Sequence, residues 1–220
     1  LLALLGVETA AHTVEIGGIK AKLMGFDDIK KNSAQDELKC ADPDASRSMS
    51  ELIKKVKEEG DSIGGIIEGI AINLPVGLGE PVFDRLDAEL AMAMMLIPAA
   101  KGVEFGAGFA AAGMKGSENN DSFTILDGKV TAATNNAGGI LGGMSTGMPL
   151  VCRVAVKPTP SISREQETVD IKKMESAALS VRGRHDACIV PRAVIVVEAM
   201  MAVTLCDFAL RAGLIPGVIK

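Results

Sequence analysis

The chain has 220 residues, 48% of them hydrophobic and 23% charged, which is sufficient for one sizeable hydrophobic core. Its net charge of −5 and the lack of any Lys/Arg stripe argue against a nucleic-acid binder. The four cysteines form no CxxC pair and match no zinc spacing, so we expect no metal and reduced thiols in a cytoplasmic protein.

The first half of the chain predicts strands separated by a loop and a helix. The chain begins LLALLGVETAAH without Met or a basic leader, which is typical of a piece of a longer protein. Apolar and polar residues alternate over residues 13–19, which predicts a strand. Residues 27–44 are polar and irregular, which indicates a loop. A Ser/Glu capping box precedes a helix over residues 50–59, and residues 63–74 read as a strand covered on both faces.

The second half predicts further strands and two helices. Residues 83–97 have the apolar spacing of an amphipathic helix, and residues 124–131 form a hairpin around the turn pair Asp127-Gly128. We expect strands over residues 102–109 and 150–156. The apolar run up to Leu210 is long enough to suggest a membrane span, but Glu198 and Asp207 within it favour a buried helix. Together these elements predict an α+β fold, a layered sandwich of antiparallel sheets and helices, in a single domain over residues 1–220.

A glycine-rich segment, NNAGGILGGMSTG over residues 135–147, is the densest candidate for ligand contact. Its many glycines would allow backbone amides to approach a ligand closely. Residues 142 and 147 have the glycine spacing of a P-loop, but Met148-Pro149 stands where Lys-Ser/Thr is needed, which excludes a nucleotide triphosphatase. The alternative is a structural role in a turn or in close sheet packing.

Two further segments carry charge. The segment Lys157-Pro-Thr-Pro-Ser161 leaves a strand, and a rigid turn with one cation and two hydroxyls suits an anion or a cofactor phosphate. The segment Arg182-Gly-Arg-His-Asp186 combines two guanidinium groups with a carboxylate. The alternatives are a Pro-rich surface turn for the first and a solvated, ion-paired loop for the second. His12, in a strand-like stretch, is read as structural rather than as a ligand.

These segments, in this order, resemble the chorismate synthase family. The strongest likeness is GRHDAC over residues 183–188, and four other segments agree in register. They are GLGEPVFDRLD (77–87), KGVEFG (101–106), NAGGILGGMS (136–145) and KPTPSI (157–162).

The resemblance implies a carbon–oxygen lyase that eliminates phosphate from 5-enolpyruvylshikimate-3-phosphate to give chorismate, in the shikimate pathway of aromatic amino-acid biosynthesis. It implies dependence on reduced FMN, although the reaction has no net redox change, and a homotetramer without nucleic-acid or membrane partners. The implied flavin-binding residues are Ala99, Gly142, Lys157, Pro158, Thr159, Pro160, Ser161 and Arg184. Asp186 matches the aspartate that assists proton movement, and Pro98 stands where the family commonly has Asn.

The chain departs from the family by lacking its N-terminal Gly-Glu-Ser-His-Gly segment and its Arg-x-Ala-Arg-Glu segment. We therefore expect the C-terminal three-fifths or so of a larger enzyme domain, inactive by itself. The alternatives are a truncated, non-catalytic flavin-binding or assembly module and an unrelated α+β interaction protein.

Overall fold

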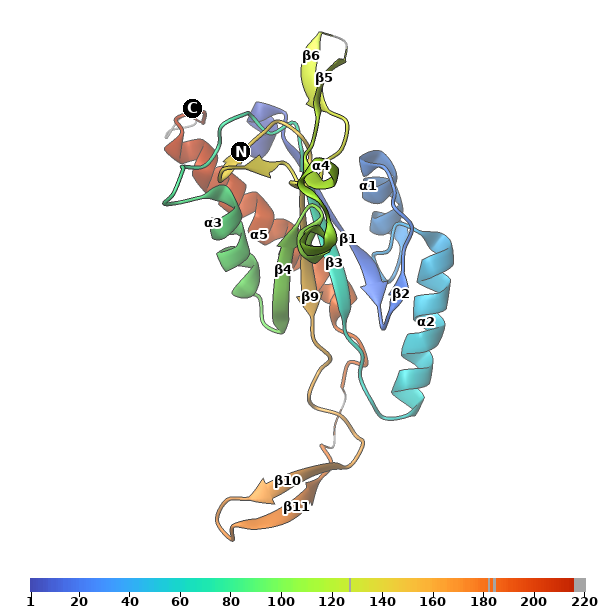
Figure 1. Cartoon of the computed structure of the whole chain (residues 1–220). Coiled ribbons are helices and arrows are strands. Elements are labelled where there is room, and N and C mark those ends of the chain that lie inside the picture. The colour runs from blue at the N-terminus through green and yellow to red at the C-terminus, as the bar shows by residue number, and fades with distance from the viewer. Residues whose placement is uncertain (127, 182, 184, 216–220) are drawn as a thin grey trace.

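The computed structural model describes residues 1–126, 128–181, 183 and 185–215. Its principal sheet has five strands in the order β2-β1-β3-β9-β4, every neighbouring pair antiparallel (Figure 1). The strands are β1 (Glu8–Ile16), β2 (Ile19–Lys20), β3 (Gly65–Ile72), β4 (Ala100–Phe105), β5 (Phe123–Leu126), β6 (Lys129–Ala132), β7 (Ile140–Leu141), β8 (Met144–Ser145), β9 (Leu150–Val156), β10 (Gln166–Asp170) and β11 (Glu175–Leu179). The helices are η1 (Leu2–Leu5), α1 (Phe26–Gln35), α2 (Pro43–Glu58), α3 (Leu86–Met95), η2 (Gly108–Gly113), α4 (Gly116–Asn119) and α5 (Val190–Arg211).

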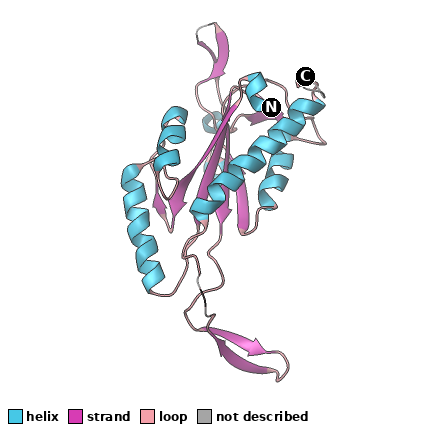
Figure 2. Cartoon of the chain, turned by 180° about the vertical axis from the view of Figure 1, so that it is seen from behind, coloured by secondary structure: helices cyan, strands magenta, loops and turns pink. Residues whose placement is uncertain are grey.

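One face of this sheet packs on α3 and α5, and α1 and α2 lie on its other side (Figures 1 and 2). On β9, Leu150, Cys152 and Val154 point to the α5 side and are fully buried. The residues between them are only half-buried, as the two-residue period of a strand requires. Gly69 on β3 lets α5 approach the sheet, because an added Cβ would lie 2.8 Å from the Met201 side chain. The main hydrophobic core therefore lies between the sheet and α5.

A second, smaller core lies on the opposite face. Ile29 of α1 packs there with Ala10, Ala41 and Ile70, all buried. The α+β architecture of antiparallel sheets and helices predicted from the sequence is confirmed, with helices on both sides of the sheet.

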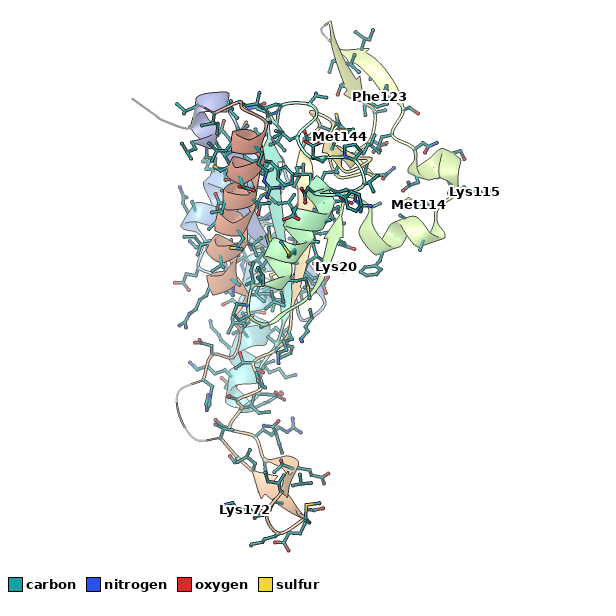
Figure 3. The ribbon with its side chains drawn as sticks, turned by 90° about the vertical axis from the view of Figure 1, so that its left-hand side faces the viewer. Lys20, Met114, Lys115, Phe123, Met144 and Lys172 are labelled. Carbon is teal, nitrogen blue, oxygen red and sulfur yellow. The ribbon has the colours of Figure 1, made fainter. Side chains whose placement is uncertain are left out.

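Two hairpins extend from opposite ends of the body. The β5–β6 hairpin projects beyond one end and the β10–β11 hairpin beyond the other, and Phe123 and Lys172 mark them in Figure 3. The hairpin predicted over residues 124–131 is confirmed, although Asp127 lies outside the described residues.

Some sequence predictions were wrong in detail. Residues 27–44 are not a loop, because α1 occupies Phe26–Gln35. The helix predicted from residue 50 begins at Pro43, since the Asp42 side chain accepts the amides of Asp44 and Ala45 and so caps the helix. The first strand begins at Glu8 instead of residue 13, and β10–β11 was not predicted.

The long apolar helix α5 satisfies the length and hydropathy of a membrane span, and a third of its apolar window is buried in the protein. One face packs on β1 and β3. The other exposes Ile195 and Val203 by 72% and 64%. The prediction of a buried helix therefore holds for one face only.

Candidate functional site

The candidate site is built around the turn that follows β9. The backbone N–H of Lys157 donates to the carbonyl of Ala99 at 3.0 Å, so the turn adjoins the residue that precedes β4. Ala99 has φ of +72°, a left-handed conformation that a residue with Cβ adopts at a cost of about 1–2 kcal/mol. The predicted residues Ala99 and Lys157 are thus neighbours, although 57 positions separate them in the chain.

The segment that precedes β3 crosses the same turn. The Ser62 hydroxyl donates to the Thr159 carbonyl at 2.6 Å. Gly64 allows the crossing, because an added Cβ would lie 2.3 Å from the Val156 carbonyl oxygen and 3.0 Å from Pro158. The turn is therefore held from two sides, which suits a preorganised binding loop.

Two polar groups of the turn lack a partner among the residues that the structure describes. The Thr159 hydroxyl oxygen is buried without a hydrogen-bond partner there, and a buried hydroxyl normally has one. Lys157 is half-buried, and no described carboxylate forms an ion pair with its ammonium group. A hydroxyl and an ammonium in one rigid turn can bind an anion such as a phosphate.

Asp186 reaches this region through the chain that leads into α5. The Ile63 amide donates to the Ala187 carbonyl at 2.7 Å, which ties residue 187 to the segment crossing the turn. The Asp186 carboxylate pairs with Arg192 in the first turn of α5, at 2.6 Å. His185 contacts the Val181 carbonyl at 3.1 Å. Asp186 is thus oriented by a cation and remains partly exposed.

The adjacent thiol is unsuited to nucleophilic chemistry. Burial raises the pKa of the Cys188 thiol above its ordinary value. A protonated thiol is a weak nucleophile, so the chemistry of this site would depend on the charged and hydroxyl groups.

The two arginines predicted beside Asp186 lie outside the described residues. Arg182 and Arg184 belong to this group, and the assignment of Arg184 to a flavin stays a prediction.

Gly142 lies away from the other predicted residues. It occupies the turn between β7 and β8, which adjoins the beginning of β9, whereas Lys157 follows the end of β9 (Figure 1). A strand of seven residues separates these ends by about 20 Å, at ~3.3 Å per residue. Gly142 and the Lys157 turn therefore lie near opposite ends of β9.

Part of the glycine-rich segment has a packing role. Gly143 has φ of +85°, and its carbonyl accepts the Leu86 amide at 2.8 Å. An added Cβ on Gly79 would lie 2.3 Å from that carbonyl oxygen. By contrast, a Cβ on Gly142 would meet open space. Gly143 thus has the packing role that was the alternative for this segment. The backbone of Gly142 is exposed to solvent.

Comparison with known proteins shows the family of this chain. The family model described as chorismate synthase matches residues 1–210. The chain belongs to the chorismate synthase family. A chorismate synthase of Dehalococcoides mccartyi is 57% identical over all of this chain and 60% of its own length. One from Methanosarcina mazei is 55% identical over 98% of this chain and 59% of its own length.

A solved structure of the family supports the fold. The structure titled "Crystal Structure of Chorismate Synthase" has a TM-score of 0.79 and 32% identity, over 96% of this chain and 59% of the solved one. The chain thus spans about three-fifths of the length of the chorismate synthases that it matches.

Proposed function

We propose that this chain is the C-terminal part of a chorismate synthase, and that the complete protein converts 5-enolpyruvylshikimate-3-phosphate to chorismate. In this elimination the carbon–oxygen bond to phosphate breaks and a ring hydrogen leaves, so that the ring gains a second double bond. The observation that carries the assignment is the family match over residues 1–210. The product feeds aromatic amino-acid biosynthesis, and we place the enzyme in the cytoplasm.

The turn after β9 fits the phosphate of a flavin nucleotide. Lys157 supplies a cation, and the buried Thr159 hydroxyl supplies a polar group that lacks a partner. Pro158 and Pro160 fix the backbone, and Ser161 adds a second half-buried hydroxyl. Reduced FMN, when bound, would supply the electron density that assists loss of phosphate.

The chain's own residues would then position and move a proton. The bend at Ala99, held by the Lys157 amide, would fix one wall of the flavin site. Asp186 would exchange a proton at the flavin ring, with Arg192 holding its carboxylate in place. Arg184 would face an anionic group of flavin or substrate.

Gly142 would complete this site from a second copy. Gly142 lies near the opposite end of β9 from the Lys157 turn, and its backbone is accessible. A homotetramer, which we propose for the complete protein, could bring the β7–β8 turn of one copy to the Lys157 turn of another.

The alternative is a non-catalytic flavin-binding or assembly module. The observation that favours it is the coverage of about 60% of the relatives' length. We expect this chain by itself to bind FMN without turnover.

Flavin fluorescence quenching tests the cofactor assignment. Thr159→Val and Lys157→Met should each weaken FMN binding by about tenfold, because each removes one polar or charged contact to phosphate. Lys172→Met at the tip of the β10–β11 hairpin is the matched control and should bind as the parent does. Phosphate release by the complete protein, with and without Asp186→Ala, then separates the two functions. A complete protein that releases no phosphate would leave only the binding module.

A further inference from the structure

A row of four charged or polar side chains crosses the sheet on the face opposite α5. The register aligns His12 of β1, Glu68 of β3, Arg153 of β9 and Glu104 of β4 side by side. In an antiparallel sheet, residues that are paired across strands point to the same face. The main hydrophobic core lies on the other face, so this row is separate from it.

The contacts along the row are unequal. Arg153 donates from Nε to Glu104 at 2.7 Å and also bonds the Gly106 carbonyl. Within the part of the chain that the structure describes, the Glu68 carboxylate has two longer contacts, at 3.3 Å from His12 Nε2 and 3.5 Å from Arg153 Nη1. The Glu68 side chain is 8% exposed. A buried carboxylate with two long contacts has room for a further donor.

His12 also has an unused polar atom. The residue is 1% exposed, and its Nδ1 is buried without a hydrogen-bond partner among the residues that the structure describes. Its Nε2 lies 3.3 Å from the Glu68 carboxylate, so only Nδ1 is left for another group. Glu68 and His12 Nδ1 can thus both contact a polar group of a ligand, and both are too well buried for bulk water to contact them freely.

The composition of the row favours a cationic group of a ligand. Glu68 and Glu104 place two carboxylates beside the single guanidinium group of Arg153. Among the described residues no three His, Cys, Asp or Glu side chains form a metal-binding group. An ammonium group, with three donors and one positive charge, satisfies these conditions.

The row forms the floor of a hollow of about 220 Å³. Val14, Ala21, Leu23 and Ile66 line its walls. Lys20 and Lys22 also line it, each side chain exposed by about three-quarters and weakly paired at 3.8 and 3.7 Å with Glu15 and Asp44 (Lys20 is labelled in Figure 3). Drug-sized ligands fill about 300–1,000 Å³, so this hollow suits a smaller molecule.

We propose that this hollow binds the zwitterion of a small free amino acid. The ammonium group donates to His12 Nδ1 and to Glu68, and the carboxylate lies between the ammonium groups of Lys20 and Lys22. A short apolar side chain contacts Leu23 and Ile66. None of the residues that line the hollow belongs to the Lys157 turn, so the proposal does not depend on the proposed function.

Isothermal titration of the chain with L-valine tests the site, together with two analogues that each lack one charge. L-valine should bind, whereas 3-methylbutanoate and 2-methylpropylamine should bind about tenfold more weakly or not at all, since each loses one charged contact. Glu68→Gln and Lys22→Met should weaken valine binding to a similar degree. Lys172→Met and Glu175→Gln, in the β10–β11 hairpin, are the matched controls and should leave it unchanged.

Thermal unfolding establishes that each variant is folded. If Glu68→Gln does not fold, valine binding by Lys22→Met tests the proposal instead. The Lys22 side chain is exposed, so its replacement should have little effect on folding. Absence of valine binding at tens of millimolar would overturn the assignment, as would equal binding of valine and both analogues. A second copy covering the hollow, seen as assembly in sedimentation with no valine binding, would also overturn it.

Discussion

The backbone amide of Lys157 and the carbonyl of Ala99 form a 3.0 Å hydrogen bond that joins the end of β9 to the residue before β4. The bond holds Ala99 in its left-handed conformation at φ of +72°. Ala100 and Val156 pair directly beyond it, so the bend and the turn form one rigid unit.

This unit predicts unequal effects of two substitutions at Ala99. Ala99→Val should lower the free energy of unfolding by about 2 kcal/mol, because a β-branched residue is strongly disfavoured at positive φ. Ala99→Gly should lie within about 1 kcal/mol of the parent, since relief of strain offsets the greater freedom of the unfolded chain. Urea unfolding measures both, and a harmless valine would contradict the left-handed assignment.

Gly64 should tolerate no side chain. Gly64→Ala places a Cβ 2.3 Å from the Val156 carbonyl oxygen, so the backbone must move, and we expect a loss of about 2–4 kcal/mol in chemical denaturation. Gly116→Ala is the matched control, because a Cβ there meets no atom within 4 Å. Similar stabilities of the two variants would contradict the close approach of Gly64 to the Val156 carbonyl.

The Asp42 cap should make the free energy of unfolding depend on pH in the acid range. Hydrogen bonds from the Lys22 amide, and then from those of Ala45 and Asp44, hold the pKa of the Asp42 carboxyl below its usual value, against the effect of burial. The stabilisation is therefore complete above the ordinary pKa of about 3.8 and is lost as pH falls through the lower folded value.

Two substitutions separate the cap from the charge. Asp42→Ala should cost about 1–2 kcal/mol at pH 7, and Asp42→Asn, which still caps, should cost less. The difference between wild type and Asp42→Asn should shrink below pH 4 in unfolding experiments at several pH values. A difference that is constant down to pH 2 would contradict the shifted pKa.

Cys152 should make the fold sensitive to alkali. Burial raises the pKa of this thiol to about 12, while the unfolded thiol ionises near its ordinary value of 9.0. Between these values the unfolded state binds fewer protons, so the free energy of unfolding falls with rising pH by at most about 1.4 kcal/mol per pH unit. Cys152→Ala should reduce this slope between pH 9 and 11, and an unchanged slope would show that other groups cause it.

The outer face of α5 should promote association. Ile195 and Val203 lie eight residues apart, on the same side of α5, and are exposed by 72 and 64%. Sedimentation velocity should show concentration-dependent assembly of this chain, and Ile195→Glu with Val203→Glu should reduce it. Assembly that persists in that variant would contradict this role of α5 and would indicate that another surface, such as a hairpin, forms the contact.

The sequence by itself determined the elements whose pattern is local. The alternation of apolar and other residues over Leu150–Val156 predicted both the strand β9 and its buried face. The long apolar run near the end of the chain predicted the helix α5. The resemblance also rested on local segments, and it identified the family over nearly the whole chain. The sequence pattern did not predict α1. This short polar helix owes its stability to the packing of Ile29 against β1 and β3, which the local sequence does not reveal.

Tertiary structure alone decided which residues meet. Spacing could not reveal that Gly142 and Lys157 lie at opposite ends of β9, or that Ala99 adjoins Lys157, because strand pairing sets these distances. The row from His12 to Glu104 is likewise invisible in the sequence. The four residues lie far apart in the chain, and only the register of four strands brings their side chains within hydrogen-bonding reach.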